Sequence, residues 1–429
     1  IGALCREHHE RVICHGKLDP CIGEIGAGAH SQTLHAYTPA QTHAEVTRDV
    51  VATLGTPSRG YVMMLAGAVG LFLVGLFTFT MLLKEGLGLA GYNPPIMWSV
   101  YITTFVFWVG IGHAGTLISA ILFLFRSQWR TAVYRATEAM TVFAVMTAGL
   151  FPIIHIGRQW VFYWLLPYPN QRYLWPNFKS PLLWDVFAIS TYLTVSTTFL
   201  VVGLVPDIAA VRDQVSGWRK KLYAACSLGW TGSDNQWRHY TRGYLYLAAL
   251  ATPLVLSVHS VVSWDFAMSI IPGWHGTIFA PYFVAGAIYS GIGMVFTLLI
   301  PLRKMLRVEH MIVDYHFDNL AKLTLFTGSI LFYAYAMEYF VAWYSGNPFE
   351  QVTFWRRAFG PMWWAGWSMI ICNAFVSQLL WFRKIRTNLT SLFIISIFIN
   401  IGMWFERYVI VTSSLSNDHV PYAWGQMKP

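Results

Sequence analysis

The chain has 429 residues, of which 55% are hydrophobic, 17% aromatic and only 11% charged, and its mean hydropathy is +0.47. Its apolar runs are too long to fit inside one soluble core, so the composition excludes an ordinary soluble domain and predicts an all-α, polytopic membrane protein. The net charge of +9 is typical of basic cytoplasmic loops in such a protein, and we expect no nucleic-acid partner.

The first 57 residues differ from the rest of the chain because they are polar and Gly-rich. Their histidines and cysteines are His8, His9, His15, His30, His35, His43, Cys5, Cys14 and Cys21. These residue types permit a metal site, but the cysteine spacings match no compact zinc or cluster pattern. We therefore interpret residues 1–57 as an N-terminal segment of unknown role, without a metal, and residues 58–425 as the transmembrane domain.

Runs of about 20 apolar residues predict membrane-spanning helices. Nine such runs follow in chain order: 61–83, 97–125, 133–157, 183–205, 241–262, 278–300, 319–343, 362–382 and 389–412.

Alternate loops between these spans are basic. Their cations are Arg126, Arg130, Arg212, Arg219, Lys220, Lys221, Arg238, Arg303, Lys304, Arg307, Arg383, Lys384 and Arg386. The opposite loops carry few Lys or Arg, and 263–277 carries none. Since Lys and Arg gather on the cytoplasmic side, the pattern predicts that the N-terminus lies inside and the last segment outside.

The stretch "AGLFPIIHIGRQWVFYWLLPYPN" ends the third span and contains His155 and Arg158. In the predicted topology the fourth span returns from the same depth, which places Asp185 beside His155. A histidine and a carboxylate at equal depth favour substrate or proton handling, because ionisable groups in membrane spans are costly. The alternatives are that His155 only bonds a helix-end carbonyl and that Arg158 only extends toward the lipid headgroups.

Other residues in or next to the spans, most of them ionisable, extend this hypothesis. We predict that Arg158, Trp184, His259, Asp265, Glu406 and Arg407 contribute to binding a ligand near His155 and Asp185. We predict that His113, Glu138 and Glu338 form a proton path, since Glu138 and His155 lie about 25 Å apart along one helix. For Glu338 the alternative is a buried hydrogen bond.

Quinol oxidation suits such a cluster, because it releases two protons with two electrons and a histidine–carboxylate pair accepts protons near neutral pH. Haem is the competing cofactor. No span clearly carries two histidines, so we predict no haem in this chain, with ligation of a single haem by His113 or His155 as the lesser alternative. We also predict no iron–sulfur cluster in it.

Five stretches of the chain resemble the NrfD-like family of polysulfide-reductase membrane subunits. They are 93–170, "LWPNFKSPLLWDVFAISTYLTVS" and the later pieces 250–291, "YSGNPFE" and "NIGMWFERYVIV". Within the family, the chain is most similar to the larger, quinol-oxidising subunit of bacterial alternative complex III. The resemblance implies two four-helix bundles and a quinol site whose histidine and aspartate fall on His155 and Asp185.

The resemblance also implies a setting: the inner, or cytoplasmic, membrane of a bacterial cell and a respiratory or photosynthetic electron-transfer complex. The implied partners are an iron–sulfur subunit, multihaem c-type cytochrome subunits and a second NrfD-like membrane subunit. The implied substrate is a quinol, menaquinol or ubiquinol, with proton translocation as a further expectation. Members of this group commonly carry one more helix, which would follow residue 429.

Two other functions stay open. One is a quinone-reactive anchor for a molybdopterin oxidoreductase of the polysulfide-reductase type. The other is an ion-translocating or structural membrane subunit without redox chemistry.

Overall fold

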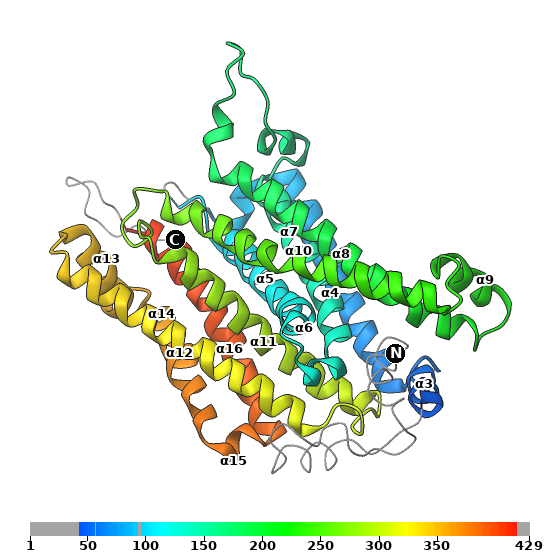
Figure 1. Cartoon of the computed structure of the whole chain (residues 1–429). Coiled ribbons are helices and arrows are strands. Elements are labelled where there is room, and N and C mark those ends of the chain that lie inside the picture. Colours follow the sequence, from blue (N-terminus) through cyan, green and yellow to red (C-terminus); the bar gives the residue numbers. More distant parts are fainter. Residues whose placement is uncertain (1–42, 56, 93–95, 418–429) are drawn as a thin grey trace.

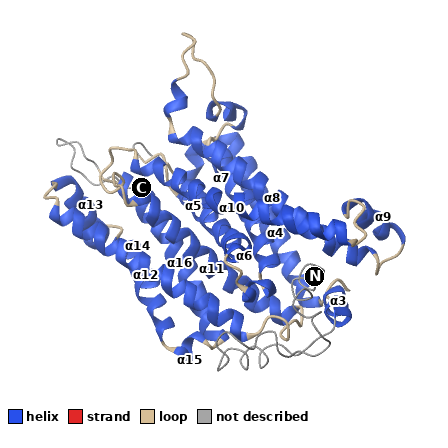
Figure 2. Cartoon of the chain, viewed as in Figure 1, coloured by secondary structure: helices blue, strands red, loops and turns tan. Residues whose placement is uncertain are grey.

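The computed structural model describes residues 43–55, 57–92 and 96–417. Every secondary-structure element within these ranges is a helix, as Figure 2 shows. The predicted all-α class is therefore confirmed. The N-terminal cysteines and the histidines up to His35 lie outside the described residues, so the interpretation of residues 1–57 stays a prediction.

Within the described residues, eight helices are long and apolar enough to cross a membrane. Five of them are single α-helices that follow one another in the middle of the chain: α7 (Tyr134–His155), α8 (Pro181–Arg212), α10 (Asp234–Ala267), α11 (Phe279–Met305) and α12 (Asp314–Tyr344). A sixth is α4 (Arg59–Glu85). The span Val100–Leu124 consists of α5 (Val100–Thr116), η2 (Leu117–Ile121) and α6 (Leu122–Leu124). The span Leu389–Ser413 consists of α16 (Leu389–Tyr408) and η8 (Val409–Ser413). These eight helices correspond to eight of the nine predicted spans, which supports the polytopic architecture.

The remaining predicted span, 362–382, is helical but consists of three consecutive pieces. These are α14 (Trp363–Ile370), the π-helical turn η6 (Ile371–Phe375) and the 3-10 helix η7 (Val376–Trp381). A π-helical turn widens the backbone locally and is common at functional sites. Here it carries Asn373, whose side chain is directed into the protein interior.

The spans pack in two groups, shown in Figure 1. The first helix group contains α5, α7, α8 and α10, and the second contains α11, α12, α14 with η6 and η7, and α16. Helix α11 joins the groups because it packs on α5 and α10 as well as on α12 and α16.

Glycines set the closest helix contacts. A Cβ atom on Gly115 of α5 would lie 1.9 Å from Thr141 Oγ1 and 2.2 Å from the Thr137 carbonyl oxygen on α7. A Cβ on Gly291 of α11 would lie 2.4 Å from Ala114 Cβ on α5. Membrane helices pack through such small residues, since lipid supplies no hydrophobic force between them.

The two ends of the helix groups differ in character. One end, which we call the basic end, carries η3 (Gln128–Ala132), α9 (Gly217–Cys226), the 306–313 loop and α15 (Arg383–Arg386). The other, which we call the loop end, carries η4 (Gln159–Leu165), η5 (Pro176–Lys179), the 268–278 loop and α13 (Pro348–Phe359). At the basic end α3 (His43–Ala52) contacts the 306–313 loop, where Asp49 pairs with His310 at 3.1 Å.

Helix α4 stands apart from both groups. No residue of its most apolar 18-residue window is buried, and its main contact among the described elements is with the short helix η1 (Leu87–Ala90) that follows it.

Candidate functional site

Asp185 and Asp265 form a pair of neighbouring carboxyl groups at the loop end of the first helix group. Asp185 lies near the start of α8 and is buried, and Asp265 lies near the end of α10. The two carboxyl groups interact electrostatically. The rings of the adjacent Trp184 and Trp264 pack edge to face with centroids 6.1 Å apart. Because two carboxylates repel each other in apolar surroundings, the pair is suited to holding a proton.

Apart from the contact between the two carboxyl groups themselves, several polar atoms at this end are buried without a hydrogen-bond partner among the described residues. They are Nδ1 of His155, both carboxyl oxygens of Asp185 and Oδ1 of Asp265. A buried polar atom without a partner costs about 1–3 kcal/mol, so several at one end of a helix group indicate a place for a polar ligand.

His155 is the last residue of α7, and its position depends on the turn that follows it. Gly157 has φ +74, and a Cβ there would lie 2.8 Å from the Leu87 side chain, so glycine suits this turn. The His155 ring lies 5.9 Å from that of Tyr92. Burial raises the pKa of Tyr92 to about 12, so its hydroxyl keeps its proton at neutral pH. No hydrogen bond or ion pair joins His155 to Asp185 or Asp265 within the described ranges.

Arg158 and Trp184 lie at the edge of this site. Arg158 is exposed and begins the turn that leads into η4. The Trp184 indole N–H donates to the Phe178 carbonyl oxygen at 2.9 Å, which ties the start of α8 to the preceding loop.

A second buried cluster lies between α5 and α10, where the rings of His113 and His259 are 4.5 Å apart and edge to face. His113 is 1% and His259 0% exposed. The Nδ1 atom of His113 is 2.8 Å from the Val109 carbonyl oxygen. Its Nε2 atom and both ring nitrogens of His259 have no partner in the part of the chain that the structure describes. Two facing imidazoles with free nitrogens can share and pass a proton.

A third cluster lies toward the basic end, around Glu138 on α7. Arg135 donates to Glu138 Oε2 and to Asp207 Oδ2, each at 3.0 Å, and thereby joins α7 to α8. The Tyr244 hydroxyl of α10 donates to Glu138 Oε1 at 2.7 Å. Glu138, placed by sequence in a proton path, therefore lies in a hydrogen-bonded network of three helices.

Glu406 and Arg407 are buried residues of α16, which belongs to the second helix group. Glu406 accepts a hydrogen bond from Tyr335 on α12 and another, at 3.5 Å, from the Asn373 amide on η6, and it pairs with Arg407. The Arg407 guanidinium lies 5.3 Å from the Phe283 ring centroid. The structure thus shows four buried polar clusters: Asp185 with Asp265, His113 with His259, Glu138 with Arg135, and Glu406 with Arg407.

Glu338 lies on α12 toward the loop end. It interacts electrostatically with Arg357 of α13 and with the hydroxyl groups of Tyr282 and Tyr335. Arg357 itself is buried and donates to the Gly273 carbonyl oxygen at 3.2 Å and to Ser414 Oγ at 2.9 Å.

Several residues of these clusters escaped the sequence analysis. The Arg135–Glu138 spacing of i, i+3 on a predicted helix is a signal that could have identified Arg135. Asp207 lies at the end of a predicted span, where an acid is unremarkable. Tyr92, Tyr335 and Asn373 carry no sequence signal, because their roles depend on contacts between helices that are distant in the chain.

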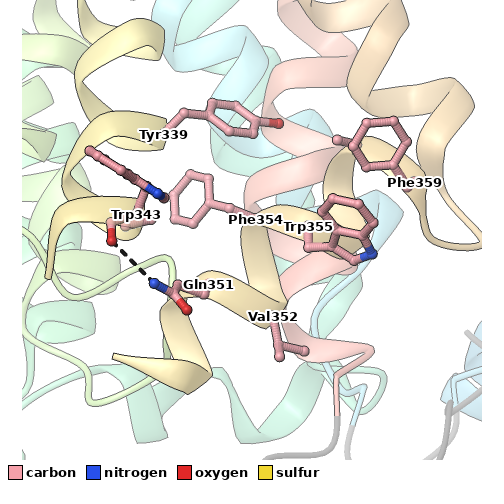
Figure 3. A pocket seen from close by; sticks show the side chains of 9 residues that line it. Tyr339, Trp343, Gln351, Val352, Phe354, Trp355 and Phe359 are labelled. Atoms are coloured by element: carbon pink, nitrogen blue, oxygen red, sulfur yellow. Dashed lines mark hydrogen bonds between the residues drawn. The ribbon is translucent and has the colours of Figure 1, made fainter. Parts of the chain in front are cut away.

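An open cavity of about 550 Å³ lies elsewhere, between α12 and α13 at the loop end, as Figure 3 shows. Its lining is mostly aromatic and includes Tyr339, Trp343, Phe354 and Trp355. None of the predicted site residues lines it. Among the described residues, no group of three or more His, Cys, Asp or Glu is arranged to hold a metal ion.

Comparison with known proteins gives a family and a relative. The family described as "Polysulphide reductase, NrfD" matches residues 88–416. A protein of Halobacterium salinarum, described as a putative membrane subunit of a dimethyl sulfoxide reductase, is 29% identical over 251 residues. The match covers 58% of this chain and 52% of the relative, so the chain spans about half the length of that curated relative.

Proposed function

Because this chain belongs to the polysulphide reductase NrfD family, we propose that it is the quinone-reactive membrane subunit of an electron-transfer complex and that it oxidises quinol. The observation that supports this site is the group of buried, unpartnered polar atoms on His155, Asp185 and Asp265 at the loop end. A quinol offers two hydroxyl groups and a flat apolar ring, which match polar atoms set beside Trp184 and Trp264.

Oxidation of quinol to quinone releases two protons and two electrons. His155 Nδ1 takes one proton, and a carboxyl oxygen of Asp185 takes the other, with Asp265 sharing the charge. Both groups are proton acceptors that work near neutral pH in a suitable setting. The two electrons leave to a partner subunit of the complex.

Residues around His155 and Asp185 hold the quinol ring in place and stabilise the charge that forms as it loses protons. Trp184 packs beside the carboxyl pair and Arg158 lies at its edge. His259, Glu406 and Arg407 complete the proposed binding set from the buried middle of the protein. Glu338 joins the proton path on the side of the second helix group.

The proposed proton path runs through the first helix group toward the basic end. The His113–His259 pair is the proton-carrying group in the middle of the path. Glu138, with Tyr244 and Arg135, is the group nearest the basic end. We propose in addition that protons cross the membrane along this path.

Two kinds of complex suit this subunit in a bacterial inner membrane. In the first, of the alternative complex III type, the partners are an iron–sulfur subunit, multihaem c-type cytochromes and a second NrfD-like subunit. In the second, the chain anchors a molybdopterin oxidoreductase, a reading favoured by the reductase subunit to which it is similar. Menaquinol and ubiquinol are both candidate substrates. A subunit that translocates ions without redox chemistry is the third candidate.

The site is tested in the assembled complex with short-chain ubiquinol and menaquinol analogues as reductants. His155→Ala and Asp185→Asn should each lower quinol oxidation by at least about a hundredfold, the scale of a lost general base. Matched controls are His239→Ala and Asp213→Asn, exposed positions near the basic end, which should keep normal turnover. Near-normal turnover in either site variant would refute the assignment.

The type of complex is decided by what purifies with the chain from native membranes. Multihaem cytochromes support the first type and a molybdopterin-containing subunit the second. A pure complex without extractable quinone, and insensitive to quinol-site inhibitors, would support the third.

A further inference from the structure

Arg407 lies between the two helix groups, beside a glycine of α11 and a glycine of α5. A Cβ atom on Gly286 of α11 would lie 3.3 Å and 3.5 Å from the two guanidinium nitrogens, and one on Gly110 of α5 would lie 3.8 Å from Nη2. The side chain is 2% exposed. A charge at such a depth is costly and is usually kept for function.

Phe283 of α11 connects this guanidinium to the histidine pair of the first helix group. The Arg407 carbon Cζ lies 5.3 Å from the Phe283 ring centroid, and the His259 ring lies 5.7 Å from it. Arg407 interacts electrostatically with both His113 and His259. Tyr192 of α8 also faces the pair, with its ring 5.3 Å from that of His113.

The two charges of the Glu406–Arg407 ion pair face different helices. Glu406 is turned toward the second helix group, where Tyr335 and Asn373 bond it. Arg407 is turned toward α5 and α11. The positive end of the pair therefore faces the histidines, and the negative end is farther from them.

We propose that Arg407 is a positioning charge that sets how readily the His113–His259 pair takes up a proton, and that Glu406 tunes this effect. The inference rests on the proposed proton path. A proton on the histidines is repelled by the guanidinium, and the Glu406 carboxylate weakens that repulsion. When Glu406 is protonated the repulsion is stronger, so proton loading in the second helix group favours proton release from the first.

The test is a pH titration of the purified complex with ¹³C-labelled histidine, in which infrared imidazole bands report the pair directly. The imidazole band of His259 is assigned by its absence from the spectrum of the His259→Asn complex. Arg407→Gln should move the titration to higher pH by about one unit, a tenfold change expected for a charge roughly 10 Å away at moderate dielectric. Glu406→Gln should move it to lower pH, and Arg407→Lys should stay near the wild type.

Two controls separate a charge effect from a structural one. In a His113→Asn, His259→Asn background the Arg407→Gln shift should vanish. Gly286→Ala, which crowds the guanidinium, should give a smaller shift than Arg407→Gln, whereas Gly149→Ala on α7 has free space and should give none.

Shifts of the same sign in Arg407→Gln and Glu406→Gln, or no shift in either, would overturn the inference. Should a charge-removing variant fail to assemble, Gly286→Ala is compared with Gly149→Ala, and equal titrations of these two complexes would overturn the inference. Because the readout needs no quinol turnover, a complex that titrates as expected but oxidises no quinol would refute the proposed function alone.

Discussion

Arg135 binds three helices of the first group at one point. It donates to Glu138 on its own helix, to Asp207 on α8 and, from the same guanidinium, to the Tyr240 hydroxyl on α10. The guanidinium fits because residue 203 has no side chain: a Cβ on Gly203 of α8 would lie 1.9 Å from Arg135 Nη1. Glycine in the middle of a helix costs stability, and here it is offset by a buried ion pair.

Gly203→Ala should therefore destabilise the protein although alanine is the better helix former. Displacing Arg135 leaves Glu138 and Asp207 without their cation, and breaking a buried ion pair costs about 3–5 kcal/mol. The measurement is thermal unfolding of the purified complex in detergent. Gly149→Ala, where a Cβ meets nothing within 4 Å, is the matched control and should change little. Equal stability of the two variants would show that Arg135 finds its partners without this space.

The residues of the candidate site differ in how far the sequence reveals them. Asp185 and Asp265 were identifiable as candidates, because acids in or beside apolar spans are rare. Their pairing with each other was not predicted, since the sequence placed Asp185 beside His155. The pairing of His259 with His113 was not, because it depends on how α10 rotates against α5, which span boundaries do not determine. The contacts of Glu406 and Arg407 were not predictable either, because they come from side chains on other helices. The role of both residues at the quinol site stays a prediction.

At the scale of elements, span length and hydropathy predicted the helices well and their interruptions poorly. The 362–382 run has the composition of a span, yet its backbone changes from α to π to 3-10 geometry around Asn373. Hydropathy reports only whether a segment prefers lipid. The local geometry follows from the hydrogen bonds of Asn373 with Tyr335 and Glu406, which belong to other helices.

Helix α4 and helix α11 represent two extremes of packing. Phe72 on α4 is 69% exposed, whereas Phe283 on α11 is 1% exposed and touches charged and aromatic neighbours. Phe283→Ala should lower the free energy of unfolding by about 3–5 kcal/mol, as in other core truncations. Phe72→Ala should change it by less than about 0.5 kcal/mol, as at other exposed positions.

The comparison is made by unfolding both complexes in the same detergent. A large loss of stability at Phe72 would contradict a lipid-facing α4 and would indicate that a helix of a partner subunit packs on it.

At the scale of the whole molecule, the basic residues define an axis across the membrane. Ion pairs at the basic end fasten the loops to the spans: Arg303 pairs with Asp314 at 2.9 Å, and Asp318 pairs with both Arg386 and Lys322 at 2.6 Å. Three polar clusters of the first helix group lie at different depths along this axis. The proposed quinol site is at the loop end, the histidine pair in the middle and the Glu138 network near the basic end. The proton path has a direction only if the axis has the orientation that the loops predict.

Cys226 offers a direct test of that orientation. It lies exposed at the end of α9, at the basic end, while Cys372 is buried. In a variant with Cys5, Cys14 and Cys21 replaced by serine, a membrane-impermeant maleimide should label Cys226 in inverted membrane vesicles and leave it unlabelled in right-side-out vesicles. The positive-inside rule requires this result, because Arg219, Lys220 and Lys221 stand on the same helix. Cys226→Ser in the same background is the control for residual labelling. Labelling in right-side-out vesicles alone would reverse the axis, and with it the side to which quinol protons are released.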